Sequence, residues 1–203
     1  MANTGTRERI LSCAAAEFSA HGFQAASLRR IVREAGVTTG AFYGYFESKE
    51  AVFAALVDEP YRVVLSGYRK VLADFDALPK NEQPENMGRI SASYMQRALD
   101  YMTEHREAFR LLLNCAAGTR YESMREEVIA LEVAATHRYY ETLEALGTPA
   151  PRVDEHLEHM LVTGMFNAYF EIILHDMTRD AARNYLRQMH EFYIAGWKKL
   201  MGA

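Results

Sequence analysis

The stretch from residue 27 to residue 49, SLRRIVREAGVTTGAFYGYFESK, constrains the fold of this chain more than any other. Read with the 3.6-residue period of an α-helix, its first part puts apolar side chains on one side of a short helix and three arginines on the other. The apolar side carries Leu28, Ile31, Val32 and Ala35. Ser27 can cap this helix, Gly36 can adopt the left-handed conformation that ends it, and Thr38 or Thr39 can cap the next one. One helix therefore ends and another begins within about three residues.

The second of these helices is very short. Phe42 and Phe46, four residues apart, face inward and anchor it. The outward side carries small residues and hydroxyl groups, namely Thr39, Gly40, Ala41, Tyr43, Gly44 and Tyr45. Two short helices joined by a tight turn with a glycine are typical of the helix-turn-helix, whose second helix enters the major groove of DNA. Small residues let the backbone approach base edges, while the hydroxyls and Lys49 can reach phosphates.

A wider pattern surrounds this helix pair. It comprises Ile31, the run from Ala35 to Tyr43, and then Phe46, Ser48, Lys49 and Glu50, and it extends back through Ile10, Ala14, Ala15, Phe18, Gly22 and Phe23. In these residues, which span roughly the first quarter of the chain, the sequence resembles the TetR family of transcriptional repressors. The resemblance is specific, because many positions agree at once.

The resemblance implies an all-α fold with two parts. Residues 1–50 are expected to form a three-helix helix-turn-helix DNA-binding domain, and residues 51–203 a larger helical domain that binds an effector and dimerises. Such a protein is a ligand-responsive homodimer, a repressor that binds a palindromic operator in double-stranded DNA and is released by a small, largely apolar effector. The DNA contacts are expected from Ser27, Arg29, Thr38, Thr39, Gly40, Ala41, Tyr43, Gly44, Tyr45 and Lys49.

The remainder of the chain reads as one helix after another, with no alternating strand pattern of useful length. Besides the two helices above, we expect helices over about residues 6–20, 48–74, 84–102, 103–117, 121–146, 152–175 and 179–201, about nine in total. Ser48 caps the long second one, and Pro60 is expected to kink it.

Stripes of apolar and small residues run along the last two expected helices at spacings of three and four. Two such hairpins related by a two-fold axis can form a four-helix bundle. The alternative is that the stripes fill the core of a monomer. The resemblance favours the dimer, because TetR-like proteins associate through their last helices. The predicted interface residues are Leu157, Leu161, Gly164, Ala168, Tyr185, Met189, Phe192 and Gly196.

Methionine and aromatic residues are frequent between residues 87 and 177. Such side chains line adaptable apolar cavities, although they also fill ordinary helical cores. Polar residues set among them need partners, which a ligand can supply. The predicted ligand contacts are Met102, Phe109, Cys115, Tyr140, Asn167 and Tyr169.

The net charge of the chain is −4 at pH 7, which taken alone argues against a nucleic-acid binder. Residues 1–50 carry six basic and five acidic side chains, a net charge of +1, so the rest carries −5. Contact with DNA would therefore depend on a small local patch that a dimer doubles.

A helical metal-binding or enzymatic bundle is the alternative function. His156 and His159, with Glu155 and Glu158, lie on one expected helix and could share a metal ion. A carboxylate-bridged centre needs a second Glu-x-x-His pair, which the chain lacks, and a solvated helix face explains the cluster. No phosphate loop, nucleophile elbow or Cys-x-x-Cys appears. We expect no enzyme, no metal ion and no cofactor.

The location of the protein is expected to be cytoplasmic. The longest weakly charged stretch, residues 161–174, is too short to cross a bilayer, and the chain opens without a signal-peptide pattern. No membrane partner is expected. Cys13 and Cys115 are expected to stay reduced in this compartment.

Overall fold

The computed structural model describes residues 4–202. Within this range the chain contains ten α-helices joined by turns and loops, one short 3-10 helix and no strand. The all-α prediction is therefore confirmed for the described residues. The outer limits predicted for the two domains, residues 1 and 203, lie outside them. No helix in the described part is long and apolar enough to cross a bilayer.

The chain divides into two compact units. The first unit comprises Met1–Val63 and His105–Met124, and the second comprises Val64–Glu104 and Arg125–Ala203. The long helix α4 (Lys49–Asp76) contributes residues to both. This division concerns packing, so the functional boundary predicted at residue 50 stays a prediction.

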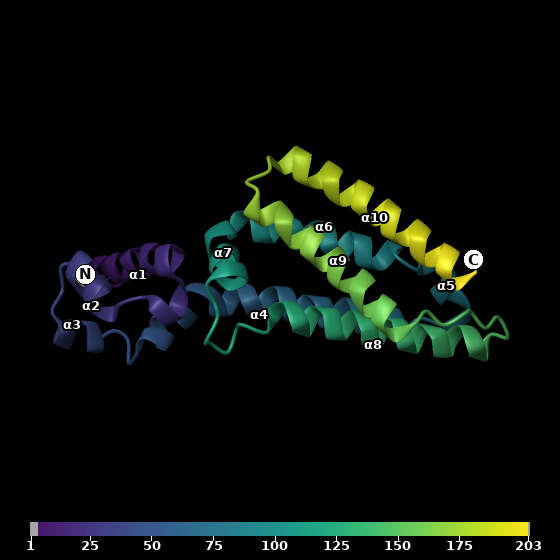
Figure 1. The fold of residues 1–203 in the computed structure, drawn as a ribbon, viewed down its shortest axis with the longest axis horizontal. Helices are drawn as coiled ribbons and strands as arrows, with labels where there is room; N and C mark the ends of the chain where they lie inside the picture. The colour runs from purple at the N-terminus through teal and green to yellow at the C-terminus, as the bar shows by residue number, and fades with distance from the viewer. Residues whose placement is uncertain (1–3, 203) are drawn as a thin grey trace. The chain divides into compact units, whose positions relative to one another are not determined.

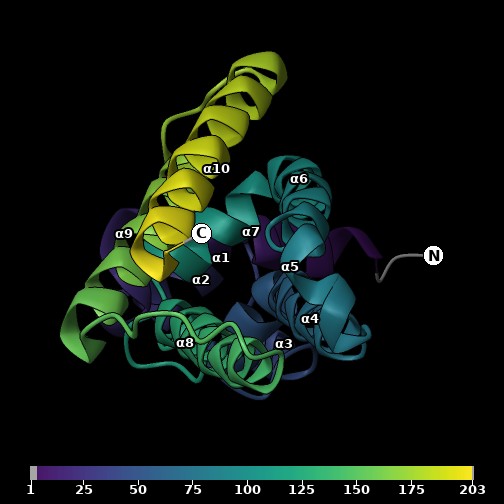
Figure 2. The same cartoon turned by 90° about the vertical axis from the view of Figure 1, so that its right-hand side faces the viewer.

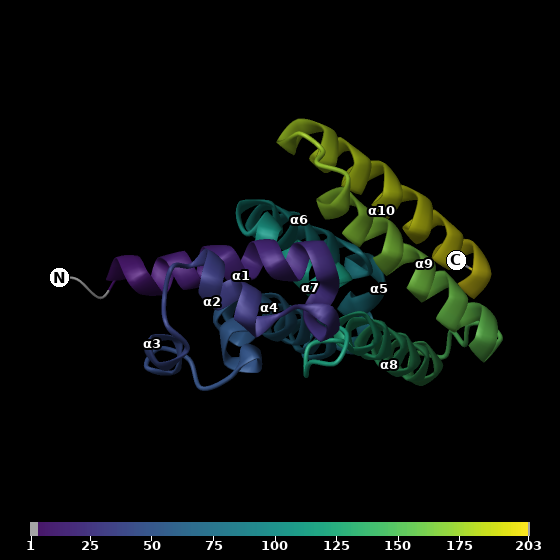
Figure 3. The same ribbon diagram turned by 60° about the vertical axis from the view of Figure 1, so that its left-hand side comes forward.

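The first unit contains α1 (Thr4–Ala25), α2 (Leu28–Glu34), α3 (Thr39–Tyr43), α7 (Arg106–Asn114) and the beginning of α4. Figure 3 shows α2 lying beside α1 and the small α3 following it. The helix expected over residues 6–20 extends to Ala25 in the structure, but it leaves helical geometry at Gly22, whose φ is 70°. Glycine tolerates this left-handed conformation, which explains why the kink falls there.

The core of the first unit forms where the sequence pattern predicts it. The inward face of α1 carries Ile10, Ala14 and Phe18, all with no exposed surface. The Phe18 ring packs edge-on against Phe53 of α4, with ring centroids 5.1 Å apart. Edge-to-face packing of this kind stabilises α1 against α4.

Helix α4 begins at a serine cap and contains an internal proline. Ser48 Oγ accepts a hydrogen bond from the N–H of Ala51 at 3.1 Å, which confirms Ser48 as the cap. The helix runs through Pro60 without a break, although proline removes one backbone donor. One helix therefore starts just after α3 and reaches into the second unit.

The second unit is built from the C-terminal half of α4 together with helices after it. These are the 3-10 helix η1 (Lys80–Glu82), α5 (Gln83–Asn86), α6 (Arg89–Glu104), α8 (Met124–Ala145), α9 (Glu155–Leu174) and α10 (Arg179–Met201). Figures 1 and 2 show the C-terminal half of α4 alongside α8, and α9 alongside α10. The single helix expected over residues 84–102 is divided into α5 and α6, because Gly88 adopts a φ of 79° between them.

Candidate nucleic-acid interface and ligand cavity

Ser27 lies at the junction between α1 and α2, and two of its groups form hydrogen bonds. Its Oγ accepts a hydrogen bond from the N–H of Arg30 at 3.4 Å, which caps α2 as the sequence predicts. Its own N–H donates to Oε1 of Glu17 at 2.8 Å. The cap is confirmed, and the contact of Ser27 with DNA stays a prediction.

The turn between α2 and α3 has the geometry that its residues predict. Gly36 has a φ of 63°, in the left-handed region that glycine adopts most readily. Of the two following threonines, Thr38 rather than Thr39 caps α3, because Thr38 Oγ1 accepts a hydrogen bond from the N–H of Ala41 at 3.1 Å. The hydroxyl of Thr38 is therefore engaged within the protein.

Two buried phenylalanines anchor α3 and determine which of its sides faces outward. Phe42 is fully buried and Phe46 nearly so, with ring centroids 5.9 Å apart. On the outward side Thr39, Gly40, Ala41, Tyr43 and Gly44 are exposed and Tyr45 is half-buried. The outward side thus presents backbone and hydroxyl groups with little bulk, which suits close approach to base edges.

Tyr43 is the bulkiest exposed side chain of α3. It is 53% exposed, and its ring stands edge-on against Phe42 with centroids 5.5 Å apart. A Cβ added at Gly40 would meet nothing within 4 Å. The surface of α3 around Gly40 is therefore open, and the Tyr43 ring beside it is held by its contact with Phe42.

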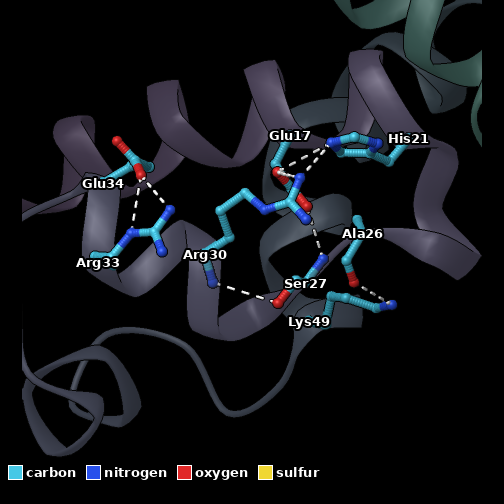
Figure 4. A network of polar contacts seen from close by, with 8 residues as sticks. All are labelled: Glu17, His21, Ala26, Ser27, Arg30, Arg33, Glu34 and Lys49. Carbon is cyan, nitrogen blue, oxygen red and sulfur yellow. Dashed lines mark hydrogen bonds and ion pairs between the residues drawn. The ribbon is translucent and has the colours of Figure 1, made fainter.

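A buried carboxylate links α1 to the start of α2 (Figure 4). The Glu17 side chain points from α1 toward α2 and is only 6% exposed. Its Oε2 lies 3.4 Å from Nη1 of Arg30 and 3.7 Å from Nε2 of His21, while its Oε1 accepts the N–H of Ser27. Because a buried carboxylate needs such partners, this network positions α2 on α1. Helical periodicity does not predict this network, because it gives no indication of contacts between different helices.

Lys49 has partners that differ from the phosphate contact predicted for it. Its Nζ donates hydrogen bonds to the carbonyl oxygens of Phe23 at 2.7 Å, Gln24 at 3.3 Å and Ala26 at 3.1 Å. An ammonium group has three N–H donors, and here three carbonyls at the C-terminal end of α1 accept from it. Figure 4 shows the bond to Ala26. Lys49 therefore caps α1, and a phosphate contact would require it to leave these carbonyls.

The arginines of α2 differ in their partners. Arg33 pairs with the adjacent Glu34 at 2.8 Å, and Arg30 pairs with Glu17. Arg29 is exposed and forms no ion pair or hydrogen bond with the described residues. Among the three, Arg29 is thus the guanidinium that can bind an external anion without breaking an existing contact.

The six residues predicted to contact a ligand are divided between the two units. Phe109 and Cys115 belong to the first unit, whereas Met102, Tyr140, Asn167 and Tyr169 belong to the second. All are buried except Asn167, which is exposed. Hydrophobic periodicity marks the buried side of a helix but does not distinguish a cavity wall from a filled core.

The polar atoms of this set already have partners within the protein. The Tyr169 hydroxyl donates to the carbonyl of Met95 at 2.9 Å, and Asn167 Oδ1 accepts from Nη1 of Arg125 at 3.1 Å. The Tyr140 hydroxyl accepts a backbone N–H from the loop before α9. Their contact with a ligand stays a prediction.

The second unit contains a cavity of about 110 Å³ elsewhere among its helices. Its walls come from the end of α4, the α5–α6 turn, α8 and α10. The lining residues are Val71, Leu72, Phe75, Met87, Gly88, Ile90, Ser91, Glu132, Ala135, Thr136, Tyr139, Ile194, Trp197 and Met201. The lining is mostly apolar with a few polar groups, which is the usual character of a small-molecule site.

Glu132 is the carboxylate in this lining, and Tyr68 of α4 donates a hydrogen bond to its Oε2. Burial raises the pKa of the Glu132 carboxyl, against the bond from Tyr68 and the charge of Arg138, which lower it. Burial also raises the pKa of the Tyr68 hydroxyl well above its usual range. Glu132 could not be identified from the sequence, because a glutamate in a helix more often faces solvent.

The residues predicted for a dimer interface lie on α9 and α10 and differ in their exposure. Phe192 is 73% exposed, Leu157 42% and Tyr185 37%, and Gly196 is also exposed. The half-buried members are Leu161, Gly164, Ala168 and Met189. Exposed large apolar side chains are a common feature of protein–protein interfaces. Their role in an interface stays a prediction.

The cluster considered for a metal ion is divided in the structure. Glu158 is buried and pairs with His137 of α8 at 2.7 Å, whereas His156 and His159 are exposed. No group of three or more His, Cys, Asp or Glu side chains among residues 4–202 could hold a metal ion. Cys13 and Cys115 are both free thiols.

Comparison with known proteins identifies relatives of this chain. The sequence profile described as bacterial regulatory proteins, tetR family, matches residues 10–56. The HTH-type transcriptional regulator YdgC of Bacillus subtilis is 50% identical over 54 residues, covering 27% of this chain and 28% of that protein. The HTH-type transcriptional repressor SCO4008 of Streptomyces coelicolor is 30% identical over 135 residues, covering 64% of this chain and 62% of that protein. The chain thus spans less than two thirds of the length of these curated relatives.

A solved structure shares the fold over the full length of the chain. It is a TetR-family transcriptional regulator from Bordetella parapertussis 12822, with a TM-score of 0.60, 19% identity and 100% of both chains covered. This likeness confirms an N-terminal helix-turn-helix followed by further helices. The matched relatives are transcriptional regulators rather than enzymes.

Proposed function

We propose that this chain, whose residues 10–56 match the tetR family of bacterial regulatory proteins, is a TetR-family regulator and a ligand-responsive transcriptional repressor. It acts in the cytoplasm as a homodimer that binds a palindromic operator in double-stranded DNA. A small, largely apolar effector releases it. The observation that carries the proposal is the outward side of α3, which is anchored by two buried phenylalanines and presents small residues and hydroxyls.

The contacts with DNA follow from the chemistry of that surface. Gly40 and Ala41 let the backbone of α3 approach base edges, and the hydroxyls of Thr39 and Tyr43 reach phosphates. Arg29, which has no partner among the described residues, adds a guanidinium for a phosphate or a base edge. The remaining predicted contacts, Ser27, Thr38, Gly44 and Tyr45, support this surface at its edges.

A dimer is needed because one short helix offers too little contact for a selective site. Two copies of α3, spaced by about one turn of DNA, or roughly 34 Å, double the contact and read two half-sites. The exposed apolar side chains of α9 and α10 support this assembly, since burying Phe192 and Leu157 removes apolar surface from water. The two-fold axis of the dimer explains why the operator would be palindromic.

Release by an effector follows from linkage between the cavity and α3. α4 begins six residues after α3 ends, and its last turns supply Val71, Leu72 and Phe75 to the cavity wall. If DNA favours one conformation of α4 and the effector another, each weakens the binding of the other. A preference of about 1.4 kcal/mol between the two conformations changes operator affinity tenfold.

Selection of duplexes from a random pool with the purified protein tests the DNA proposal. We expect a palindrome with half-sites about one helical turn apart, bound more weakly as salt rises. The double variant Thr39→Ala, Tyr43→Phe should bind this site more weakly, while Tyr101→Phe in α6, outside α3 and the proposed dimer interface, serves as a matched control. Recovery of no enriched sequence, or equal binding by the double variant, would show that α3 does not read DNA.

A further inference from the structure

We propose that the cavity of the second unit binds a small apolar molecule that carries a protonated amine, with Glu132 as its anionic partner. The cavity and the carboxylate carry this inference. Binding of this ligand can be measured without DNA. Only its role as the effector that releases the operator rests on the proposed function. Nothing in the comparisons assigns a ligand to this cavity.

The charge of the lining points to a cation. Among the lining residues Glu132 is the only Asp, Glu, Lys, Arg or His. The guanidinium of Arg138, which follows it on α8, is held by Asp76 of α4 at 2.7 Å. A ligand in the cavity therefore meets one carboxylate and no basic lining residue, an environment that favours positive charge.

The Glu132 carboxylate is oriented but not saturated. Tyr68, itself buried, donates a hydrogen bond to Oε2 and so holds the group in place. A carboxylate can accept about four hydrogen bonds, and Glu132 forms no other hydrogen bond or ion pair with the described residues. An ammonium group, which carries several N–H donors, fits the remaining acceptor positions.

The rest of the lining determines the size and shape of the ligand. A volume of about 110 Å³ is somewhat below the ~150 Å³ of an apolar cavity that holds benzene. Phe75, Tyr139 and Trp197 offer aromatic surfaces, which pack against a ring and attract a nearby cation. Because this volume is below that of the benzene cavity, the apolar part of the ligand is at most a single ring, and its amine lies at the cavity wall beside Glu132.

Neutral and anionic analogues of that shape should bind less well than the amine, because neither can neutralise the charge of Glu132. A neutral ligand would cover Glu132 without neutralising its charge, and burying an unpaired carboxylate is costly. An anion would add repulsion at short range. The preference among three analogues of equal size thus reports the charge of the site.

The experiment titrates the purified full chain with benzylamine, benzyl alcohol and benzoate at neutral pH. Trp197, the only tryptophan of the protein, lines the cavity, so its fluorescence reports occupancy directly. We expect benzylamine to bind about ten- to a hundredfold more tightly than benzyl alcohol, the range for one hydrogen bond to a charged group. Benzoate should not compete with it.

Two variants of α8 test whether the preference for the amine comes from Glu132. Glu132→Gln should lower benzylamine affinity by about tenfold or more and raise benzyl alcohol affinity, because the buried charge is gone, while Glu141→Gln, at an exposed position of the same helix, should change neither. Equal binding of the three analogues to the unaltered protein would overturn the proposal whatever the variants do. Unchanged benzylamine affinity in a folded Glu132→Gln protein would also overturn it. Operator affinity measured without ligand separates this outcome from failure of the proposed function.

Discussion

The backbone N–H of Ser27 donates a 2.8 Å hydrogen bond to the buried carboxylate of Glu17. This bond joins the residue that caps α2 to the core-facing side of α1, ten residues earlier. The orientation of α2, and of α3 after it, therefore depends on a buried carboxylate of α1. Removal of the Glu17 carboxylate should therefore lower both the stability of the protein and its affinity for DNA.

Glu17→Ala should lower the free energy of unfolding by about 1–3 kcal/mol, because the Ser27 N–H and the Arg30 guanidinium lose a buried partner. Urea denaturation followed by circular dichroism measures this change. The control is Glu34→Ala, which removes an exposed ion pair with Arg33 and should cost about 0–1 kcal/mol. Similar costs for the two variants would contradict the structural role of Glu17.

Lys49→Met keeps the apolar stem of the side chain and removes the ammonium that caps α1. It should lower the free energy of unfolding by about 1–3 kcal/mol, since three carbonyls lose a donor. The slope of log affinity for the operator against log salt should stay unchanged, because this ammonium neutralises no phosphate in the arrangement described. A slope that becomes shallower by about one per phosphate contact would restore the predicted contact of Lys49 with DNA.

Arg29→Ala should change DNA binding and leave stability nearly unaltered, which is the opposite of the result expected for Lys49→Met. The exposed guanidinium has no partner among the described residues, so stability should change by less than about 0.5 kcal/mol. If Arg29 binds a phosphate, the salt slope should become shallower by about one for each subunit. Fluorescence anisotropy with a labelled operator over a range of salt concentrations measures it. Unaltered affinity and slope would remove Arg29 from the interface.

Phe192→Glu should convert the dimer to a monomer, because it places a charge where a 73% exposed phenylalanine would be buried against a second copy. Sedimentation velocity at several concentrations measures the change. Lys198→Gln, also exposed on α10, changes the charge by the same amount and should leave the dimer intact. A dimer that survives Phe192→Glu would place the interface elsewhere.

Glu132→Gln should raise stability at neutral pH. Because burial raises the pKa of Glu132, the native state binds this proton more tightly than the unfolded state does. Stability from this group is complete below its ordinary pKa and is lost as the pH rises through the raised value. Glutamine remains uncharged and can still accept the hydrogen bond from Tyr68. Melting temperatures of both proteins between pH 4 and about pH 8 should diverge as the pH rises.

Local features of the fold were predictable because they depend on neighbouring residues. Ser27, Thr38 and Ser48 each accept a hydrogen bond from an N–H three residues ahead, and Gly36 adopts a conformation that its own lack of a Cβ permits. The buried face of α1 follows from periodicity in the same way. The division of the helix near Gly88 was missed, since a glycine can also continue a helix at modest cost.

The sequence by itself determined the helix-turn-helix, its caps and the outward side of α3, because these depend on interactions within a few residues. Only the tertiary structure decided the partners of Lys49, 23 to 26 residues away, and of Glu132, 64 residues away. It also decided which walls enclose the cavity. Contacts of this range depend on how helices pack, and the period of a single helix records which side is buried but not what it is buried against.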